Sequence, residues 1–342
     1  MQISLGIQGI GGMNGFSAGA LYYLRTKTDI KPELVSITSG AIMTFFHYLN
    51  ADPEKLKEMF YTEAQERLNQ GLFTPFIHPD NAKIAQFFNA AMFGIPGVFR
   101  PKNMFDRLEE LRQMDIGTYA SPNQWIRMMF PSAIYEKTMP SSVFQEIADC
   151  FNASDIGIIA NAYNYRTGKA IVYVNQAASD ALQGSRFQIG SYSDSFEIHP
   201  ISSDGIAACL QLIQYGPYQD QYDGAYQYNP IIPPLKKAKD VMLITVVPIT
   251  RPLKPIDHYF DIEDFKLKMM FVNAISSELA STELINSFID QGIITDKSIE
   301  KTRLHLIEPE MVKGYFDYFV GDPKMFEHGY QQAEEMLKKW HP

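Results

Sequence analysis

The first fifty residues alternate between short apolar runs and segments whose apolar residues recur at helical spacing. Residues 2–7 form an apolar run that ends in a cluster of glycines, and residues 16–25 follow with small and apolar side chains. A second apolar run at 34–37 precedes another helical pattern that reaches Leu49. Strand, helix, strand and helix in this order are typical of an α/β protein with a parallel sheet.

The rest of the chain carries further patterns around one looser stretch. Between 71 and 142, aromatic and methionine side chains are interrupted by prolines, which fits either helical core with loops or an apolar cap over a lipid-like site. The patterns predict strands at 156–164, 169–175, 241–247 and 304–309, and helices at 204–215 and over most of the chain after 257. The stretch 215–232 is expected to be rich in loops.

Composition and charge narrow the class of protein. Hydrophobic residues make up 46% of the chain, which is enough for a large core. The net charge of −9 argues against a nucleic-acid-binding protein, because such a protein needs a basic surface. The two cysteines, Cys150 and Cys209, exclude a disulfide-rich scaffold and fit a reducing compartment.

Targeting signals are not visible in the sequence. The N-terminus has no basic region ahead of an apolar segment, so a signal peptide is not expected. The longest apolar run, 241–249, is about half the length of a membrane span. We therefore expect a soluble, cytoplasmic protein. The scattered histidines have no metal-ligand spacing, so neither a metal nor a cofactor is expected.

The glycine cluster after the first strand allows several interpretations. A phosphate-binding P-loop is excluded because no lysine follows Gly15. A dinucleotide site is disfavoured because Asn14 occupies the last glycine position and Asp29 precedes the second strand rather than ending it. Two interpretations remain: an oxyanion-hole loop, in which backbone N–H groups converge on negative charge, or a tight structural turn.

A second candidate lies at the junction of the second strand and its helix. A nucleophile elbow needs small residues two before and two after its tip, because strand and helix nearly touch there. Around Thr38 these positions hold Ser36 and Gly40, whereas around Ser39 one of them would be Ile37. Sterics therefore favour Thr38 at the tip, although a β-branched residue tolerates a strained backbone poorly. An ordinary turn with a capping hydroxyl is the alternative.

A third candidate is Asp223-Gly224, followed by Asn229-Pro230. Asp-Gly pairs are common in turns. A carboxylate that a loop delivers to the same sheet edge could instead serve as a general base.

The order of these three motifs resembles the patatin-like phospholipase family. In that family a Gly-Gly-Gly loop with a basic residue follows the first strand, Gly-Thr-Ser-Ala-Gly-Ala forms the elbow, and a distant Asp-Gly follows. The matching segments here are 10–15, 36–41, 52–56, 160–169 and 222–230. The late strand at 304–309 and the final helix are similar to bacterial members, so the resemblance covers nearly the whole chain. It implies a three-layer α/β/α fold with a mostly parallel central sheet.

The resemblance also implies a domain organisation. The catalytic domain would span 1–250, with 70–142 as a helical, cap-like insertion. A mainly helical C-terminal extension, 251–342, would pack on the same domain.

The chemistry implied by the resemblance is hydrolysis of acyl esters by a hydroxyl–aspartate dyad without histidine. Asp223 would be the base, and the backbone N–H groups of Gly11, Gly12 and Met13 would hold the oxyanion while an acyl-enzyme forms. The supporting motif residues would be Gly15, Ser36, Gly40 and Gly224. Phospholipids or other fatty-acyl esters would be the substrates, with transient contact to a membrane surface.

The elbow leaves three hypotheses open. Aligned without gaps, Thr38 occupies the position of the family's nucleophilic serine. A shift of one residue would make Ser39 the nucleophile. In the third hypothesis the site is inactive, and the protein binds lipid or acts as a scaffold.

Overall fold

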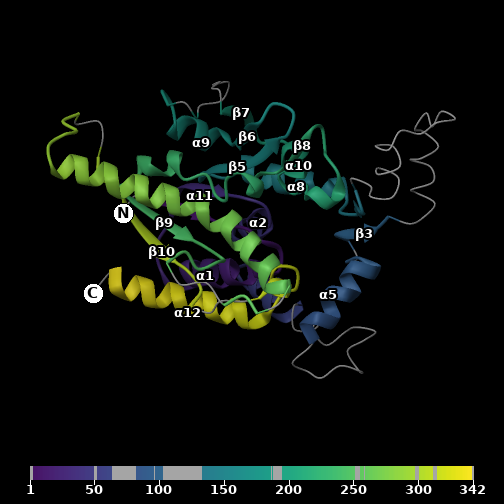
Figure 1. Cartoon of the computed structure of the whole chain (residues 1–342). Coiled ribbons are helices and arrows are strands. Elements are labelled where there is room, and N and C mark those ends of the chain that lie inside the picture. Colours follow the sequence, from purple (N-terminus) through teal and green to yellow (C-terminus); the bar gives the residue numbers. More distant parts are fainter. Residues whose placement is uncertain are drawn as a thin grey trace.

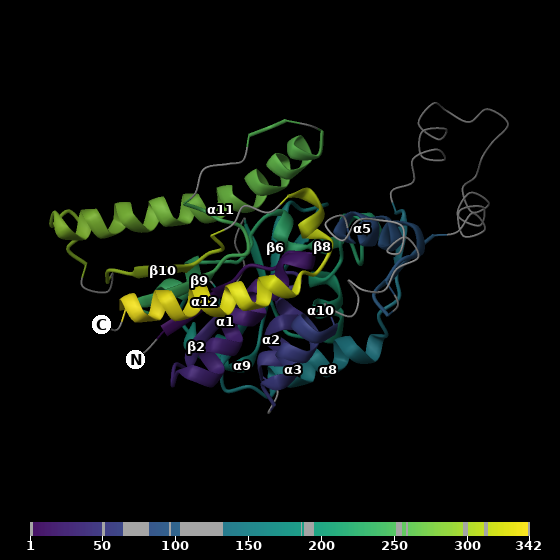
Figure 2. The same cartoon turned by 90° about the horizontal axis from the view of Figure 1, so that it is seen from below.

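The protein is an α/β fold built around one mostly parallel central sheet with helices on both faces (Figures 1 and 2). The computed structural model describes residues 3–49, 52–63, 82–95, 97–102, 133–185, 187, 195–250, 255–257, 259–296, 300–310 and 314–340. Among these residues, no helix is both long and apolar enough to cross a membrane. The expected α/β class with a mostly parallel sheet is confirmed.

The central sheet has its strands in the order β10-β9-β1-β2-β5-β6-β7, and β8 pairs with β5 outside this path. Their bounds are β1 Ile3–Ile7, β2 Pro32–Ile37, β5 Gly157–Asn164, β6 Lys169–Val174, β7 Phe196–Pro200, β8 Gln221–Asp223, β9 Asp240–Ile244 and β10 Arg303–Ile307. The five strands from β10 to β5 are parallel, whereas β6 and β8 pair with β5 in the antiparallel sense. A separate hairpin joins β3 (Phe99–Pro101) to β4 (Tyr135–Lys137).

Helices cover the two faces of this sheet. One face carries α1 (Asn14–Lys27), α2 (Ala41–Leu49), α8 (Ser141–Asn152), α10 (Ser203–Cys209) and α12 (Pro323–Trp340), and the other carries α9 (Gln176–Ala181) and α11 (Tyr259–Asp290). Along β9, Met242 and Ile244 belong to the first core, and Val241 and Leu243 to the second. This alternation is expected of a strand that is buried on both faces.

Short elements connect these layers. They are α3 (Glu54–Lys57), the π-helical turn η2 (Glu58–Thr62), α5 (Ala82–Phe93) and the 3-10 turns η1 (Gly11–Met13), η5 (Ile213–Tyr215), η6 (Gly224–Tyr226), η7 (Pro233–Lys237) and η8 (Tyr315–Tyr318).

The first and last helices, α1 and α12, touch backbone to backbone. A Cβ atom at Gly19 would lie 1.8 Å from the Phe326 carbonyl oxygen, and one at Gly329 would lie 1.9 Å from that of Phe16. Because no side chain fits at either glycine, the C-terminal helix is seated directly on the helix that follows the glycine loop.

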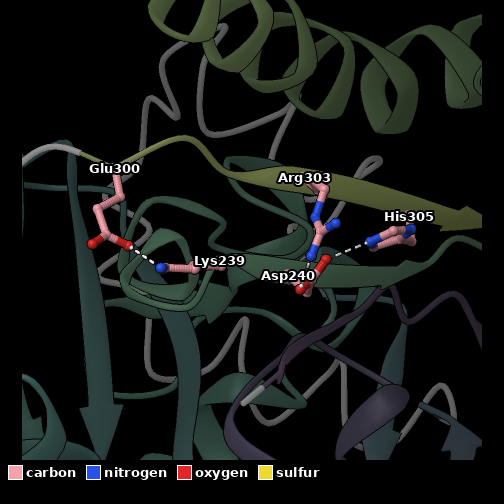
Figure 3. Close-up of polar contacts among 5 residues, drawn as sticks. All are labelled: Lys239, Asp240, Glu300, Arg303 and His305. Carbon is pink, nitrogen blue, oxygen red and sulfur yellow. Dashed lines mark hydrogen bonds and ion pairs between the residues drawn. The ribbon is translucent and has the colours of Figure 1, made fainter. Parts of the chain in front are cut away.

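Polar contacts fix the edge strand β10 to β9 (Figure 3). The buried Asp240 carboxylate accepts hydrogen bonds from Arg303 at 2.7 Å and His305 at 2.9 Å, and Lys239 pairs with Glu300 at 3.1 Å. Burial alone would raise the pKa of Asp240, but these two hydrogen-bond partners outweigh it and lower that pKa.

Most predicted strands are confirmed, and the differences are instructive. The helix expected at 204–215 ends at Cys209, and the chain predicted to be loop contains β8. The prediction omitted β7, α8 and α9. Within the expected insertion the structure describes α5, β3 and β4, whereas 71–81 and 103–132 lie outside the described residues, so the cap stays a prediction.

Candidate functional site

The pairing of β5 brings the candidate residues to one edge of the sheet. Ile37, the last residue of β2, pairs with Ala160, and Asp223 of β8 pairs with Ala162 farther along β5. Because β6 occupies the other edge of β5, β2 and β8 share one edge in succession. Along that edge of β5, Asp223 therefore follows the end of β2. This is the point at which the chain leaves β2 and enters α2. The loop after β1 reaches the same place, since Ile7 pairs with Ile37.

The turn between β2 and α2 has Ser39 at its tip. Ser39 has a φ of 57°, the left-handed conformation that a side chain adopts at a cost. The fully buried Thr38 hydroxyl points elsewhere and donates a hydrogen bond to Asn161 Oδ1 at 2.6 Å. The expectation that Thr38 occupies the tip is therefore corrected. The structure brings Ser39, the alternative residue, to Asp223.

The loop after β1 packs directly against this turn. A Cβ atom at Gly9 would lie 2.1 Å from the Thr38 carbonyl oxygen and 2.4 Å from the Ala41 nitrogen. No side chain fits at Gly9 while the turn keeps this shape. Gly40 is also required, because its Cβ would lie 1.9 Å from the Asn14 side-chain nitrogen.

Asp223 is a fully buried carboxyl group. Its Oδ1 accepts a hydrogen bond from the Ala225 N–H at 2.9 Å, which makes a short turn at the end of β8. Burial raises the pKa of Asp223 to about 7, while hydrogen bonding from the Ser39 hydroxyl and from Ala225 opposes the rise. Within the described chain, Oδ2 accepts no hydrogen bond of regular geometry.

Lys137, at the end of β4, supplies a half-buried positive charge near Asp223. Its Nζ donates to the Ala207 carbonyl oxygen at 2.8 Å and lies 4.8 Å from the Phe144 ring centre and 5.7 Å from that of Tyr218. Burial lowers the pKa of Lys137 to about 8, and its charge in turn lowers the pKa of Asp223. Sequence reasoning missed Lys137, because nothing local in the sequence distinguishes it from a surface lysine.

The glycine loop forms the 3-10 turn η1, and its N–H groups are not equivalent. The Met13 N–H donates to the Ile10 carbonyl oxygen at 2.8 Å, so the expectation that it holds an oxyanion is corrected. Within the described chain, the N–H groups of Gly11 and Gly12 have no acceptor, as is usual at the start of a helical turn. Asn14 accepts the Ile10 N–H at 2.9 Å and so closes the loop.

Two buried asparagines hold the loop and the Asp-Gly motif in place. Asn229 clamps Gly9 from both sides, accepting from its N–H at 3.0 Å and donating to its carbonyl oxygen at 3.1 Å. Asn161 donates to the Tyr228 carbonyl oxygen at 3.1 Å. A Cβ at Gly224 would lie 2.0 Å from the Asn161 side-chain nitrogen, so this glycine is required. Asn161 and Asn229 appear in the matched motifs, but their roles follow only from these contacts.

The other two supporting residues lie away from the reacting groups. The Ser36 hydroxyl accepts the Ile231 N–H at 3.1 Å. A Cβ at Gly15 would meet its nearest atoms, in Asp322 and Met325, at an ordinary 3.5 Å, so close packing does not demand glycine there.

The surroundings of Asp223 are aromatic and apolar. Tyr215 and Tyr226 lie near its carboxyl, and burial raises the pKa of Tyr226 to about 12. Leu212 and Ile213 follow α10 close by and have exposed side chains.

Among the described residues, no three or more His, Cys, Asp or Glu side chains are arranged to hold a metal ion. The arrangement brings a hydroxyl, a carboxyl of near-neutral pKa and N–H groups without an acceptor to one edge of the sheet. An acyl transfer uses such groups as nucleophile, general base and oxyanion donors. Comparison of the chain with models of known protein families finds no match, and comparison with curated protein sequences finds none either.

Proposed function

We propose that the protein is a lipid acyl hydrolase of the patatin-like type, with Ser39 as nucleophile and Asp223 as general base. The observation that carries the proposal is the position of Ser39. It occupies a left-handed conformation at a strand-to-helix turn, beside a buried carboxyl whose pKa lies near neutrality. A general base is most effective when its pKa is close to the working pH.

The reaction proceeds in two halves. Asp223 takes the proton from the Ser39 hydroxyl, and Oγ attacks the ester carbonyl carbon. The N–H groups of Gly11 and Gly12 stabilise the oxyanion, and the departing alcohol receives the proton from Asp223. In the second half Asp223 takes a proton from water, which attacks the acyl-enzyme and releases the fatty acid and the Ser39 hydroxyl.

Thr38 has a positioning role in this scheme. Its hydroxyl is bonded to Asn161, and Asn161 also holds the chain after the Asp-Gly motif. This bond ties the turn that carries Ser39 to the turn that carries Asp223.

The proposed substrates are phospholipids or other fatty-acyl esters. The aromatic and apolar side chains around Asp223 and the motifs shared with the patatin-like family support this class. A substrate of this kind would be taken from a membrane surface or a micelle during transient contact.

Hydrolysis of a panel of phospholipids, lysophospholipids and short acyl esters tests the proposal. Ser39→Ala should lower the rate by about three orders of magnitude or more, because it removes the nucleophile. Thr38→Ser is the matched control and should keep most of the activity, since serine can donate the same bond to Asn161. If Thr38→Ala abolishes hydrolysis and Ser39→Ala does not, the nucleophile is Thr38 and the proposed dyad is wrong.

The alternative is a patatin-like protein that binds lipid without cleaving it. Ser39 is only 7% exposed, and this burial is the observation that favours it. Wild-type protein that binds lipid vesicles but hydrolyses none of the panel would establish the alternative.

A further inference from the structure

The candidate oxyanion loop touches a segment from the far end of the chain. A Cβ atom at Gly11 would lie 2.4 Å from the Tyr318 carbonyl oxygen, and one at Gly12 would lie 2.5 Å from the Val320 nitrogen. The backbone of η8 and the residues after it is therefore pressed directly against the backbone of η1. The conformation of the loop depends on where η8 lies.

Tyr318 anchors η8 to the interior, unlike the aromatic residues around it. Tyr315, Phe316 and Phe319 have ring contacts with Phe87 of α5 or Phe260 of α11. The Tyr318 side chain is instead only 4% exposed. Both views place the segment ahead of α12 at the start of α11 (Figures 1 and 2).

A buried ion pair on α11 lies close to the Tyr318 side chain. Asp264 Oδ2 pairs with Lys268 Nζ at 2.7 Å, and these side chains are 4% and 3% exposed. Burial raises the pKa of Tyr318 above its usual range, and the nearby negative charge of Asp264 adds to the rise. Among the described residues, Asp264 Oδ1 accepts no hydrogen bond and is the acceptor that this buried pair leaves open.

We propose that Tyr318 is a positioning residue for the oxyanion loop. The Asp264–Lys268 pair fixes the Tyr318 hydroxyl, Tyr318 fixes the backbone of η8, and η8 holds Gly11 and Gly12 with their N–H groups free. The catalytic consequence rests on the proposed function, whereas the positioning of the loop does not. The C-terminal region then shapes the candidate site, in addition to packing on the sheet.

The test compares Tyr318→Phe with Tyr315→Phe, which removes a hydroxyl from the same short helix. Amide hydrogen exchange is measured at Met13 and Asn14, whose N–H groups donate to Ile10 and Gly11 within the loop. Tyr318→Phe should speed exchange at both amides by about tenfold, and Tyr315→Phe should not. With an ester substrate, Tyr318→Phe should lower kcat by about tenfold or more and leave KM unchanged.

A second route removes the acceptor instead of the donor. The double variant Asp264→Leu/Lys268→Met deletes both charges together, so no unpaired charge stays buried. It should speed amide exchange at Met13 and Asn14 as Tyr318→Phe does. If Tyr318→Phe fails to fold, this double variant alone tests the positioning role of Tyr318.

The outcomes separate this proposal from the proposed function. Unchanged exchange at both amides in the folded variants overturns the positioning role, whether or not the protein hydrolyses esters. Faster exchange in a wild-type background that cleaves no ester supports the positioning role and refutes the hydrolase. Faster exchange with an unchanged kcat overturns the catalytic consequence.

Discussion

The proposed mechanism depends on Asp223, a buried carboxyl group that must ionise to act as a base. The turn at the end of β8 satisfies one oxygen of Asp223 through Ala225, and the other oxygen accepts no hydrogen bond among the described residues. Such a group destabilises the fold when charged, which is common where chemistry requires a perturbed pKa. This cost can be measured independently of any substrate.

The first residue-scale prediction concerns the pH dependence of stability in Asp223→Asn. The pKa of Asp223 is 3.8 in the unfolded chain and about 7 in the fold. Between these values unfolding releases a proton, so wild-type stability falls as pH rises, and above pH 7 the loss stays constant. Asparagine does not ionise, so the stability of the variant lacks this dependence on pH. Denaturant unfolding should therefore show the variant gaining about 2–3 kcal/mol on the wild type between pH 5 and pH 8. A difference that does not change with pH would mean that Asp223 titrates normally.

The second residue-scale prediction concerns Lys137→Met, which keeps the apolar stem between the Phe144 and Tyr218 rings. Removing the ammonium removes a charge that lowers the pKa of Asp223, so this pKa should rise. Because the base acts when ionised, the acid limb of the pH–rate profile should move to higher pH by about one unit. Lys137→Arg keeps the charge and serves as the control. A lower rate with an unmoved acid limb would assign Lys137 a structural role only.

At the scale of elements, the regular strands could be predicted from sequence and the short ones could not. Long apolar runs such as 157–164 can be recognised as strands from their length and composition. In contrast, β8 has only three residues and lies in a stretch rich in glycine and proline. The turn between the second strand and its helix lies where the sequence placed it, but Ser39 and not Thr38 has the left-handed conformation there. Sequence spacing along one segment does not reveal that Gly9, in the loop after β1, packs against this turn.

The same limit applies to the partners of the candidate site. Asn161 and Asn229 act through contacts with residues far away in the chain, namely Thr38 and Gly9. A sequence motif can identify such residues as candidates. Their partners become visible only when the pairing register of the strands is known. The occupied N–H of Met13 likewise depends on how tightly the loop turns.

At the scale of the whole molecule, two distant regions converge on the central sheet edge. The insertion contributes Lys137 from β4, and the C-terminal region contributes the η8 backbone that packs on Gly11 and Gly12. Close contact between α1 and α12 seats the C-terminal helix next to the glycine loop. We therefore expect the site to require nearly the full chain.

The central claim, that Ser39 is a nucleophile activated by Asp223, can be tested most directly by covalent labelling. A fluorophosphonate forms a phosphorus–oxygen bond with an activated hydroxyl and loses fluoride, and peptide mass spectrometry locates the bond. We predict a single label on Ser39 in the wild type and in Thr38→Ser, none in Ser39→Ala, and labelling slowed by about two orders of magnitude or more in Asp223→Asn. A label on Thr38, or a Ser39 that stays unlabelled in the folded wild type, would contradict the account.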